Sequence, residues 1–337
     1  HLYECETLAF ATQPYILEVD LPQIGFPPIS ETCFIVQDSG VVFDGQGHSI
    51  TGGGGSNTYG VYASGLNSIL VKNVNISNFS QGVFFNNVNS SVIENSVFSN
   101  NSLNGINLAS SNNNTIKNNL VQNNSDKGIS LNLDSFNNTI IGNTLRSNNI
   151  GVRILSNGNI VVNNSFTSNS DGLAIDPSAC CASNNFIENN TFFNQTNAGV
   201  NIRQTENIIL KNNYFYTNKF GIYYSGLPSV YTNDSFQGGI INESSNDAIY
   251  IFQSGGTFTF SNLTIIGTNK SHYDIHSDAF TTLSRFNFEQ MPHIGNYSLS
   301  GSNYFIRVNN SFGEINFLEG ISSATGSNFT RDISILN

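Results

Sequence analysis

The chain is poor in positive charge. Its 337 residues include 12 Lys and Arg against 23 Asp and Glu, which gives a formal net charge of −11. Because phosphate backbones are bound by clustered positive charge, we expect no nucleic-acid partner. No stretch reaches the roughly 18–20 apolar residues of a membrane-spanning helix, so we expect no membrane span in this chain. The sequence begins with His1 and shows no signal peptide there, which favours a removed leader or a piece of a longer chain.

Tryptophan is absent, methionine occurs once, and charged residues make up only 10% of the chain. The 26 Phe and 13 Tyr still supply enough apolar mass for a continuous core, which argues against intrinsic disorder. Asparagine is abundant: it occurs 55 times, and never before Asn57. The chain therefore has at least two compositional zones.

The four cysteines include no CxxC or CxxCH motif, so structural zinc and c-type haem are not indicated. Cys5 and Cys33 could form a disulfide, which would close a loop of about 28 residues and contribute roughly 3–4 kcal/mol. They could also be reduced and buried. The adjacent Cys180 and Cys181 could form a strained ring, link to another chain or stay free.

A glycine followed by alternating apolar residues, Gly-Φ-x-Φ with Φ apolar, recurs along the chain. Successive glycines are 22, 23, 23, 23, 21, 27 and 22 residues apart. They are Gly60, Gly82, Gly105, Gly128, Gly151, Gly172, Gly199 and Gly221. A fixed period of this size indicates a solenoid or a related repeat architecture.

Two further apolar segments follow each glycine, separated by polar turn residues. The second segments occupy 68–73, 91–95, 114–118, 138–143, 159–164, 185–190 and 207–213, and the third include Phe98, Val121, Leu145, Phe166, Phe192 and Phe215. Short strands bounded by Asn, Ser and Gly differ from the longer amphipathic pattern of a helical repeat. We predict an all-β parallel β-helix with coils of about 22–23 residues.

Asparagine suits the corners of such coils, because it tolerates left-handed backbone conformations. Asparagines stacked at the same corner of successive coils can also hydrogen-bond through their side-chain amides. We predict one such ladder from Asn95, Asn118, Asn163, Asn189 and Asn212.

The period, the NxTIxxN segments and the Gly-Φ-x-Φ segments resemble the right-handed parallel β-helix repeat family over roughly residues 40–270. NosD-like and carbohydrate-active β-helix proteins belong to this family. The N-terminal part, with Cys5, Tyr15-Ile16-Leu17, Cys33 and VVFDGQGHSITG (41–52), resembles the first coils of archaeal surface proteins of this class. That resemblance implies that the two cysteines bracket an entry cap. It implies the fold far more strongly than any activity.

The predicted organisation is an N-terminal cap over 1–40, the β-helix over 41–285 and a β-strand segment over 286–337. Loop insertions are expected near 177–183 and 226–238. Residues 308–337 resemble the strand-rich segment that follows the helix in such surface proteins, which suggests that more chain followed. Strands near 320–337 could pair with another subunit by strand addition.

Seventeen Asn-x-Ser/Thr sequons make N-glycosylation a candidate modification, although corner chemistry alone also generates such triplets. The acceptors are Asn75, Asn78, Asn89, Asn100, Asn113, Asn123, Asn137, Asn163, Asn189, Asn194, Asn233, Asn242, Asn262, Asn269, Asn296, Asn309 and Asn328.

A catalytic site is sought among the residues that face outward after each repeat glycine, because their neighbours at positions +1 and +3 face inward. The charged members of that row are Arg153, Asp176 and Arg203. Glycoside hydrolysis needs two carboxylates, and a lyase needs a base and usually clustered acids that hold calcium. One Asp between two Arg supplies neither set, so we interpret these residues as a salt bridge. Asp44 and His48 in DGQGH are interpreted as turn residues, with Asp44 capping backbone amides.

The run from His272 to Asp278 alternates His and Asp, so His272, Asp274, His276 and Asp278 would share one face of a strand. Such a face could bind a divalent metal or do acid–base work, or it could simply be solvated. We expect no cofactor, no metal and no catalytic residue. One Met and five His offer little for a copper-delivery role.

These observations favour a non-enzymatic structural glycoprotein of the cell surface, and the resemblance to archaeal surface proteins implies an archaeal source and an adhesive role. We expect it to self-associate into a surface layer or an extracellular filament, to carry covalent N-glycans and to contact surface glycans. The alternative hypothesis is a β-helix enzyme or binding module that cleaves or binds polysaccharide.

Overall fold

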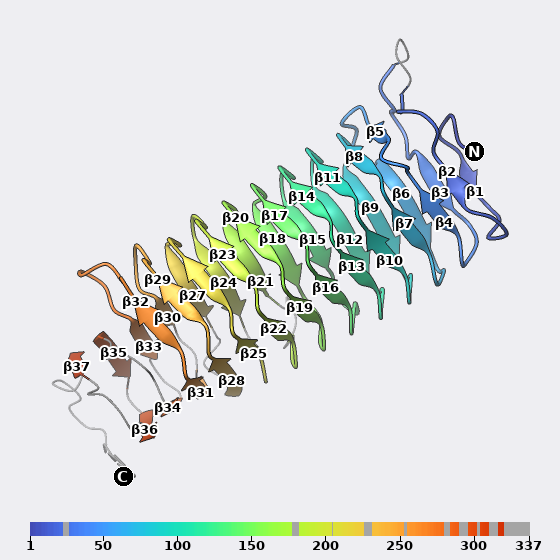
Figure 1. Cartoon of the computed structure of the whole chain (residues 1–337). Helices are drawn as coiled ribbons and strands as arrows, with labels where there is room; N and C mark the ends of the chain where they lie inside the picture. Colours follow the sequence, from blue (N-terminus) through green and yellow to red (C-terminus); the bar gives the residue numbers. More distant parts are fainter. Residues whose placement is uncertain are drawn as a thin grey trace. The chain divides into compact units, whose positions relative to one another are not determined.

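The computed structural model describes residues 1–22, 27–176, 182–203, 205–225, 231–252, 255–279, 284–289, 296–301, 304–309 and 316–319. The chain folds as the all-β, right-handed parallel β-helix that the sequence predicts (Figure 1). It divides into two compact units, His1–Ser170 (unit 1) and Asp171–Asn337 (unit 2). In the described ranges no helix is long and apolar enough to cross a membrane.

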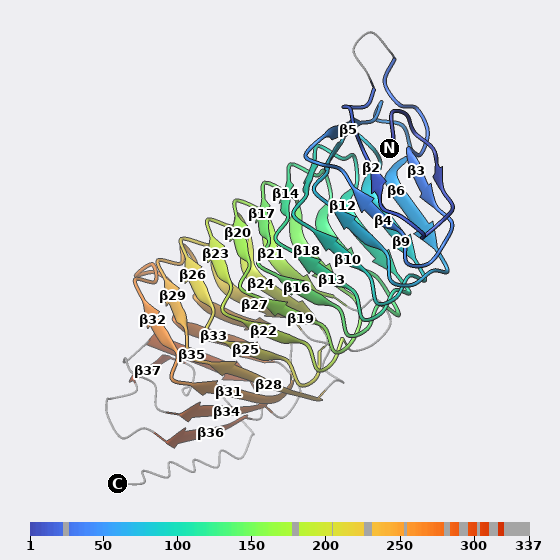
Figure 2. The same ribbon diagram turned by 45° about the vertical axis from the view of Figure 1, so that its right-hand side comes forward.

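Unit 1 contains three parallel sheets, to which each coil contributes one strand (Figure 2). Sheet 1 contains β1 (Thr7–Leu8), β3 (Phe34–Val36), β6 (Tyr59–Ser64), β9 (Gln81–Asn86), β12 (Asn104–Ala109), β15 (Lys127–Leu131) and β18 (Ile150–Ile154). Sheet 2 contains β2 (Tyr15–Ile16), β4 (Val42–Asp44), β7 (Leu70–Lys72), β10 (Val92–Glu94), β13 (Thr115–Lys117), β16 (Thr139–Ile141) and β19 (Ile160–Val162). Sheet 3 contains β5 (Ser49–Thr51), β8 (Asn75–Ser77), β11 (Val97–Ser99), β14 (Leu120–Gln122), β17 (Thr144–Arg146) and β20 (Ser165–Thr167).

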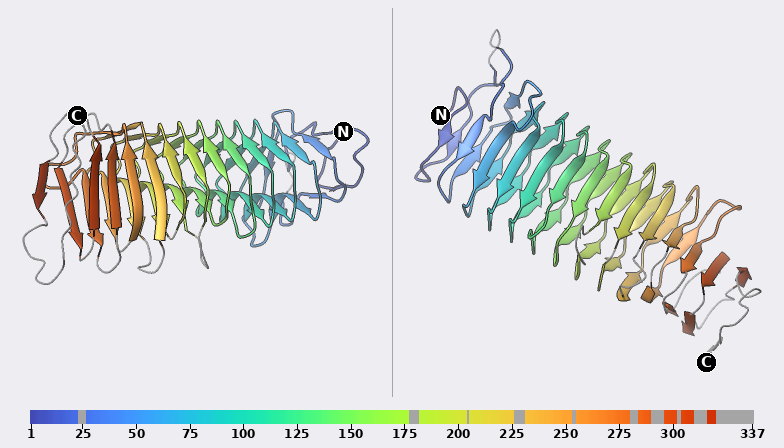
Figure 3. Two further views of the ribbon diagram at one scale, coloured as in Figure 1. Left: turned by 90° about the horizontal axis from the view of Figure 1, so that it is seen from below. Right: turned by 180° about the vertical axis from the view of Figure 1, so that it is seen from behind.

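Unit 2 is built from the same three kinds of strand (Figure 3). Sheet 1 strands are β21 (Asp171–Ile175), β24 (Ala198–Arg203), β27 (Phe220–Ser225), β30 (Ile249–Phe252), β33 (Ile275–Ala279), β35 (Asn296–Gly301) and β37 (Asn316–Glu319). Sheet 2 strands are β22 (Phe186–Glu188), β25 (Ile209–Lys211), β28 (Tyr231–Gln237), β31 (Gly255–Ser261), β34 (Ser284–Glu289) and β36 (Tyr304–Asn309). Sheet 3 strands are β23 (Thr191–Phe193), β26 (Tyr214–Tyr216), β29 (Ile240–Asn242) and β32 (Thr264–Ile266).

The alternation after each repeat glycine sets the core as predicted. Ile106 and Leu108 follow Gly105 at positions +1 and +3, and both are 0% exposed. The glycine itself is required by packing: a Cβ on Gly105 would lie 2.7 Å from the carbonyl oxygen of Gly128 and 2.6 Å from Cγ1 of Val121. Real Cβ atoms do not approach backbone this closely, so Gly105 tolerates no side chain.

The predicted asparagine row is correct in conformation and wrong as a ladder. Asn95, Asn118, Asn163, Asn189 and Asn212 all have positive φ, between 50° and 56°. The buried ladder is formed by the residue that follows each of them. In unit 1 it contains Asn119, Asn143 and Asn164, joined by amide hydrogen bonds of 3.1 Å, and in unit 2 Asn190 bonds Asn213 in the same way.

A second buried ladder in unit 1 contains Asn101, Asn124, Asn148 and Asn169. The Oδ1 of Asn124 accepts from the backbone nitrogen of Asn101 at 3.1 Å and from its Nδ2 at 2.9 Å. The Nδ2 of Asn124 donates to Asn148 Oδ1 at 3.0 Å and to the Phe98 carbonyl at 3.2 Å. Each ladder amide therefore contacts the coils before and after its own.

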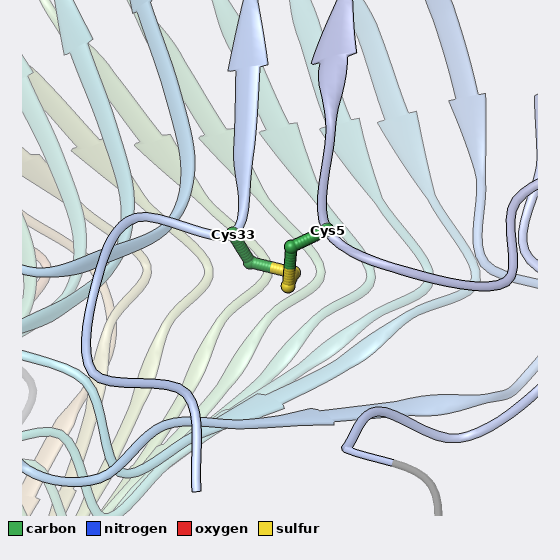
Figure 4. The surroundings of a disulfide bond; sticks show 2 residues. All are labelled: Cys5 and Cys33. Atoms are coloured by element: carbon green, nitrogen blue, oxygen red, sulfur yellow. A yellow bond between two sulfur atoms is a disulfide. The ribbon is translucent and has the colours of Figure 1, made fainter.

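The N-terminal segment is tied to the coils by both pairing and a covalent bond. A disulfide joins Cys5 and Cys33, whose Cα atoms are 4.5 Å apart (Figure 4). β1 pairs with β3, β2 with β4, and β3 with β6, so coil pairing already includes residues before 41. β34 (Ser284–Glu289) spans the second proposed boundary, which lies between residues 285 and 286. The three-part division at 40/41 and 285/286 remains a prediction.

Several predicted features lie outside the described residues. These are Cys180 and Cys181, most of the insertion near 177–183, residues 226–230 of the second insertion, and the segment 320–337 proposed for strand addition.

We expect Asn124→Ala to lower the free energy of unfolding by about 3–4 kcal/mol. It removes four side-chain hydrogen bonds worth about 1 kcal/mol each and leaves buried amides of two coils unsatisfied. The matched control is Asn123→Gly at the adjacent exposed corner, where glycine accepts the positive φ and the change stays within about 0.5 kcal/mol. Urea unfolding monitored by circular dichroism compares the two, and equal losses would contradict the ladder's role.

We expect a reducing agent to lower the melting temperature, because the disulfide closes a loop with a sequence separation of 28. The chain-entropy contribution is roughly 3–4 kcal/mol. Thermal melting of the Cys5→Ser/Cys33→Ser double variant provides the control, since it should melt early with or without the reductant. A melting curve unaffected by reduction in the unmodified chain would show that the bond adds no stability.

Candidate functional site

The predicted turn around Asp44 is present. Its Oδ1 accepts hydrogen bonds from the backbone nitrogen of Gln46 and from Nδ2 of Asn73, both at 3.0 Å, and its Oδ2 lies 3.1 Å from Lys72 Nζ. Burial raises the pKa of Asp44, but these hydrogen bonds and the charge of Lys72 outweigh it and lower the pKa. The ionised Asp44 carboxylate therefore stabilises the turn through contacts with Gln46, Asn73 and Lys72.

The predicted salt bridge is formed in unit 2. Arg203 Nη1 lies 3.6 Å from Asp176 Oδ2, and the two side chains are 54% and 34% exposed. An ion pair this solvated contributes at most about 1 kcal/mol. Arg153 lies on β18 of unit 1, in register with Ser130.

The prediction that His272, Asp274, His276 and Asp278 share one strand face is wrong in part. β33 begins at Ile275, so His272 and Asp274 precede the strand. Asp274 accepts a hydrogen bond from Thr268 Oγ1 at 2.5 Å. Within the strand, His276 is in register with Tyr250.

Asp247, which the sequence analysis missed, brings the two histidines together. His276 Nδ1 lies 2.9 Å from Asp247 Oδ2, and His272 Nδ1 lies 3.5 Å from Oδ1. The backbone nitrogen of Tyr273 also donates to Oδ1 at 2.7 Å. The sequence does hold a clue to this contact. Asp247 lies one coil before His276, directly before Ala248, and Ala248 occupies the place of the repeat glycine in that coil.

The carboxylate of Asp247 is ionised at neutral pH. It is only 6% exposed, and this burial raises its pKa. The hydrogen bonds from His276 and from the Tyr273 backbone, with the positive charges of His276 and His272, act in the opposite direction and lower the pKa overall. Asp247 thereby fixes the orientation of the His276 ring.

Aromatic rings line the outer face of sheet 1 beside this cluster. Tyr223 on β27 and Tyr250 on β30 have ring centroids 5.6 Å apart, and the Tyr250 ring lies 4.9 Å from the His276 ring. Phe220 lies 5.4 Å from Tyr223, and Phe252 lies 6.1 Å from Tyr250. All four aromatic residues are partly exposed. We call these four residues, with Asp247, His272 and His276, the aromatic face of unit 2.

A polar cluster continues the same sheet on β21 and β24. Asp171 accepts hydrogen bonds from Asn197 Nδ2 at 2.7 Å and from Asn201 Nδ2 at 3.0 Å. Asn201 is in register with Tyr223, and its buried Oδ1 has no hydrogen-bond partner among the described residues. Amides therefore adjoin the aromatic rings along the sheet.

Unit 1 carries a smaller aromatic group on its own sheet 1. The rings of Tyr59 and Tyr62 on β6 are stacked with centroids 5.4 Å apart, and Phe84 on β9 lies 5.2 Å from Tyr59. Burial raises the pKa of the Tyr59 phenol, and the neighbouring Tyr62 raises it further. The group has no carboxylate–histidine pair comparable to the Asp247 cluster among the contacts of the described residues.

The side chains of the aromatic face have the chemistry for ligand binding and for proton exchange. Aromatic rings stack on apolar ring faces of a ligand, while the imidazoles and amides can hydrogen-bond its hydroxyl groups. In the described part of the chain, no group of three or more His, Cys, Asp or Glu residues could hold a metal ion. Asp247 is paired with imidazoles and not with the second carboxylate that glycoside hydrolysis uses.

A different carboxylate, Asp234, is buried inside unit 2. It is 1% exposed and accepts hydrogen bonds from the Tyr224 hydroxyl at 2.7 Å and from the Ile208 backbone nitrogen at 2.8 Å. Burial raises its pKa to about 6, against the opposing effect of hydrogen bonds from Tyr224, Ile208 and Thr205. Its place in the core gives it a role in stability and none on the aromatic face.

Residues 27–182 match the family described as periplasmic copper-binding protein (NosD), which is less than half of the chain. No curated protein matches the chain. Among solved structures, it is similar to the Azotobacter vinelandii mannuronan C-5 epimerase AlgE4 A-module, with 14% identity, a TM-score of 0.57, and coverage of 90% of this chain and 91% of that one.

The AlgE6 A-module of the same organism has 12% identity, a TM-score of 0.53 and 92% coverage of both chains. The catalytic domain of a GH87 alpha-1,3-glucanase in complex with tetrasaccharides has 14% identity and a TM-score of 0.50. It is covered over 62% of its length, and this chain over 82%. At these identities the likeness concerns the fold: the chain is a parallel β-helix protein whose residues 27–182 carry a NosD-like repeat.

We expect the buried Asp234 to make unit 2 less stable as the pH rises from about 4 to about 7. Between the unfolded pKa of 3.8 and the folded pKa of about 6, the folded state binds a proton that the unfolded state does not. The stabilisation is complete below 3.8 and is lost as the pH rises through about 6. The upward shift corresponds to about 3 kcal/mol.

Asp234→Asn removes this titration while keeping an oxygen that can accept from Ile208. Urea unfolding at a series of pH values should show the difference between the two proteins growing across this window, in favour of the variant. Parallel pH profiles would refute the proposed protonation of Asp234.

Proposed function

We propose that the chain is a carbohydrate-binding β-helix protein that works outside the cytoplasm and binds a polysaccharide along the aromatic face of unit 2. The observation that carries the proposal is the row of rings across β27, β30 and β33. Tyr223, Tyr250 and His276 succeed one another at 5.6 Å and 4.9 Å, with Asp247 and His272 beside them.

Parallel strands present equivalent residues about every 4.8 Å along the sheet. An extended sugar chain lying along the coils would therefore meet a ring or a polar group at each coil. Aromatic rings accept the C–H faces of sugars, and the Asp171–Asn197–Asn201 cluster and the imidazoles offer partners for their hydroxyl groups. The rings are held by packing on one another, so little ordering is required on binding.

Location outside the cytoplasm is supported by the Cys5–Cys33 disulfide and by the periplasmic description of the matched family. The similar structures are also polysaccharide enzymes by name, an epimerase and a glucanase. The role that the sequence analysis favoured, a subunit of a surface layer or filament, depends on joining through residues 320–337, which lie outside the described residues.

A second candidate function is catalysis on the bound polysaccharide by proton transfer. The observation that favours it is the 2.9 Å contact between Asp247 and His276, since a carboxylate that orients an imidazole is a common arrangement for general acid–base work. In this role His276 would exchange a proton with the sugar, and Asp247 would stabilise the imidazolium.

We expect Tyr250→Ala to weaken polysaccharide binding at least tenfold, equivalent to about 1.4 kcal/mol, because it removes the ring that contacts Tyr223, Phe252 and His276. Tyr214→Ala is the matched control, since Tyr214 is 38% exposed on β26 of sheet 3. Affinity electrophoresis against a panel of neutral and acidic polysaccharides measures both variants. Failure of the unmodified chain to bind any member, or equal binding by both variants, would overturn the proposal.

We expect His276→Gln to separate the two functions. If the face only binds, the variant keeps measurable affinity and the unmodified chain leaves the bound polysaccharide unchanged by size-exclusion chromatography and NMR. If the face is catalytic, the unmodified chain changes the polysaccharide and His276→Gln stops that change while retaining binding.

A further inference from the structure

The coil corners of both units share one arrangement of three residues. An exposed residue with positive φ comes first, a buried residue that often belongs to an amide ladder comes second, and the chain then enters the next segment. The sequence Asn-Asn-Ser/Thr fits this arrangement directly, as at Asn113-Asn114-Thr115 and Asn163-Asn164-Ser165. The same three residues form a sequon.

Nine of the seventeen sequons lie at such corners. Their acceptor asparagines are exposed, with φ between 49° and 57°, and the middle residue of each is at most 3% exposed. The acceptors are Asn78, Asn100, Asn113, Asn123, Asn137 and Asn163 in unit 1, and Asn189, Asn194 and Asn262 in unit 2. Because the backbone turns outward there, a group on the asparagine side chain does not enter the core or the ladder.

Other sequons have a different geometry. Asn75 lies on β8 and donates from Nδ2 to the Gly47 carbonyl at 2.8 Å. Asn269 donates from Nδ2 to the Ser245 carbonyl at 3.1 Å. A sugar on either nitrogen would compete with a backbone hydrogen bond, so these two sites differ from the corner sites although they carry the same sequence motif.

We propose that the nine corner asparagines are N-glycosylation sites, with the corner geometry selecting them from the seventeen sequons. The donor would be a lipid-phosphate-linked oligosaccharide. The Asn Nδ2 forms a bond to the anomeric carbon, the bond from that carbon to the phosphate oxygen breaks, and the lipid phosphate leaves with the electron pair. The proton lost from Nδ2 passes to a base of the transferase.

The positions of the nine corner asparagines determine which part of the surface glycans would cover. None of the nine acceptors lies on a strand of sheet 1, the sheet that carries the aromatic face of unit 2. Six of the nine corners adjoin sheet 1 strands, and the corners of Asn163, Asn189 and Asn262 lie between sheets 2 and 3. Glycans at these corners would cover the turns between the sheets and leave the strand residues of sheet 1 unmodified. The proposal does not depend on carbohydrate binding by the aromatic face, because it concerns other residues and another reaction.

The test is glycopeptide mass spectrometry of the full chain secreted through a pathway that contains an oligosaccharyltransferase, with a reporter glycoprotein in the same cells. We expect sugar on corner peptides and unmodified Asn75 and Asn269 peptides. Bare corner peptides beside a modified reporter would overturn the proposal. Equal modification of Asn75 and the corner sites would overturn the selection by geometry.

A matched pair of variants tests the corner itself. Asn118 has the same exposed, positive-φ place as Asn163, but Leu120 stands where a sequon needs Ser or Thr. Leu120 is in register with Thr144, which is in register with Ser165, so the position accepts a hydroxyl residue. Leu120→Thr should convert the Asn118 peptide from unmodified to glycosylated, and Ser165→Ala should do the reverse at Asn163. An unmodified Asn118 in the first variant would contradict the inference.

Discussion

Each unit depends on the hydrogen bonds between buried amides at the coil corners. The amide oxygen of one ladder residue accepts from the previous coil, and its nitrogen donates to the next coil and to a carbonyl of the previous one. These groups are almost completely buried, so a coil of the wrong length would leave donors and acceptors unsatisfied at a cost of about 1–3 kcal/mol each. The repeat period is nearly constant because the hydrogen bonds between ladder residues require coils of nearly equal length.

Because of this constraint, different positions of the coil require different types of residue. Inward residues are apolar, and the second corner residue is buried and often carries an amide or a hydroxyl group. At repeat glycines such as Gly105 and Gly221, an added side chain would meet the backbone of the next coil. The outward residues of sheet 1 carry none of these requirements. They are consequently the positions where function can vary without loss of the fold, and the aromatic rings of unit 2 are found there.

This difference between positions required by the fold and outward positions that are free to vary explains which features the sequence could predict. Periodicity predicted the solenoid, the inward residues and the outward row after each repeat glycine, to which Tyr223 belongs as the second residue after Gly221. It placed the asparagine ladder one residue too early, because in pairs such as Asn118-Asn119 both residues are asparagine and spacing alone does not tell the exposed one from the buried one. Only the hydrogen bonds of Asn119 with Asn143 distinguish them.

The Asp247 cluster was missed for a related reason. Ala248 replaces the repeat glycine, so the Gly-Φ-x-Φ pattern ends at Gly221 and gives no register for the following coil. Without that register, the histidines of the run from His272 could only be related to acids in their own segment. Their actual partner is 29 residues before His276 in the sequence and one coil away in space.

The electrostatics of the aromatic face narrow the ligand proposed for it. The chain carries a formal net charge of −11, and the one carboxylate at the centre of the cluster is held ionised by the two histidines. Within unit 2, Arg203 is paired with Asp176, and the ammonium group of Lys219 lies 5.4 Å from the centre of the Phe220 ring. The net negative charge of the chain therefore disfavours a polyanionic polysaccharide. Stacking rings, amides and a histidine pair instead fit a neutral sugar chain, whose binding needs C–H faces and hydroxyl partners and no counter-charge.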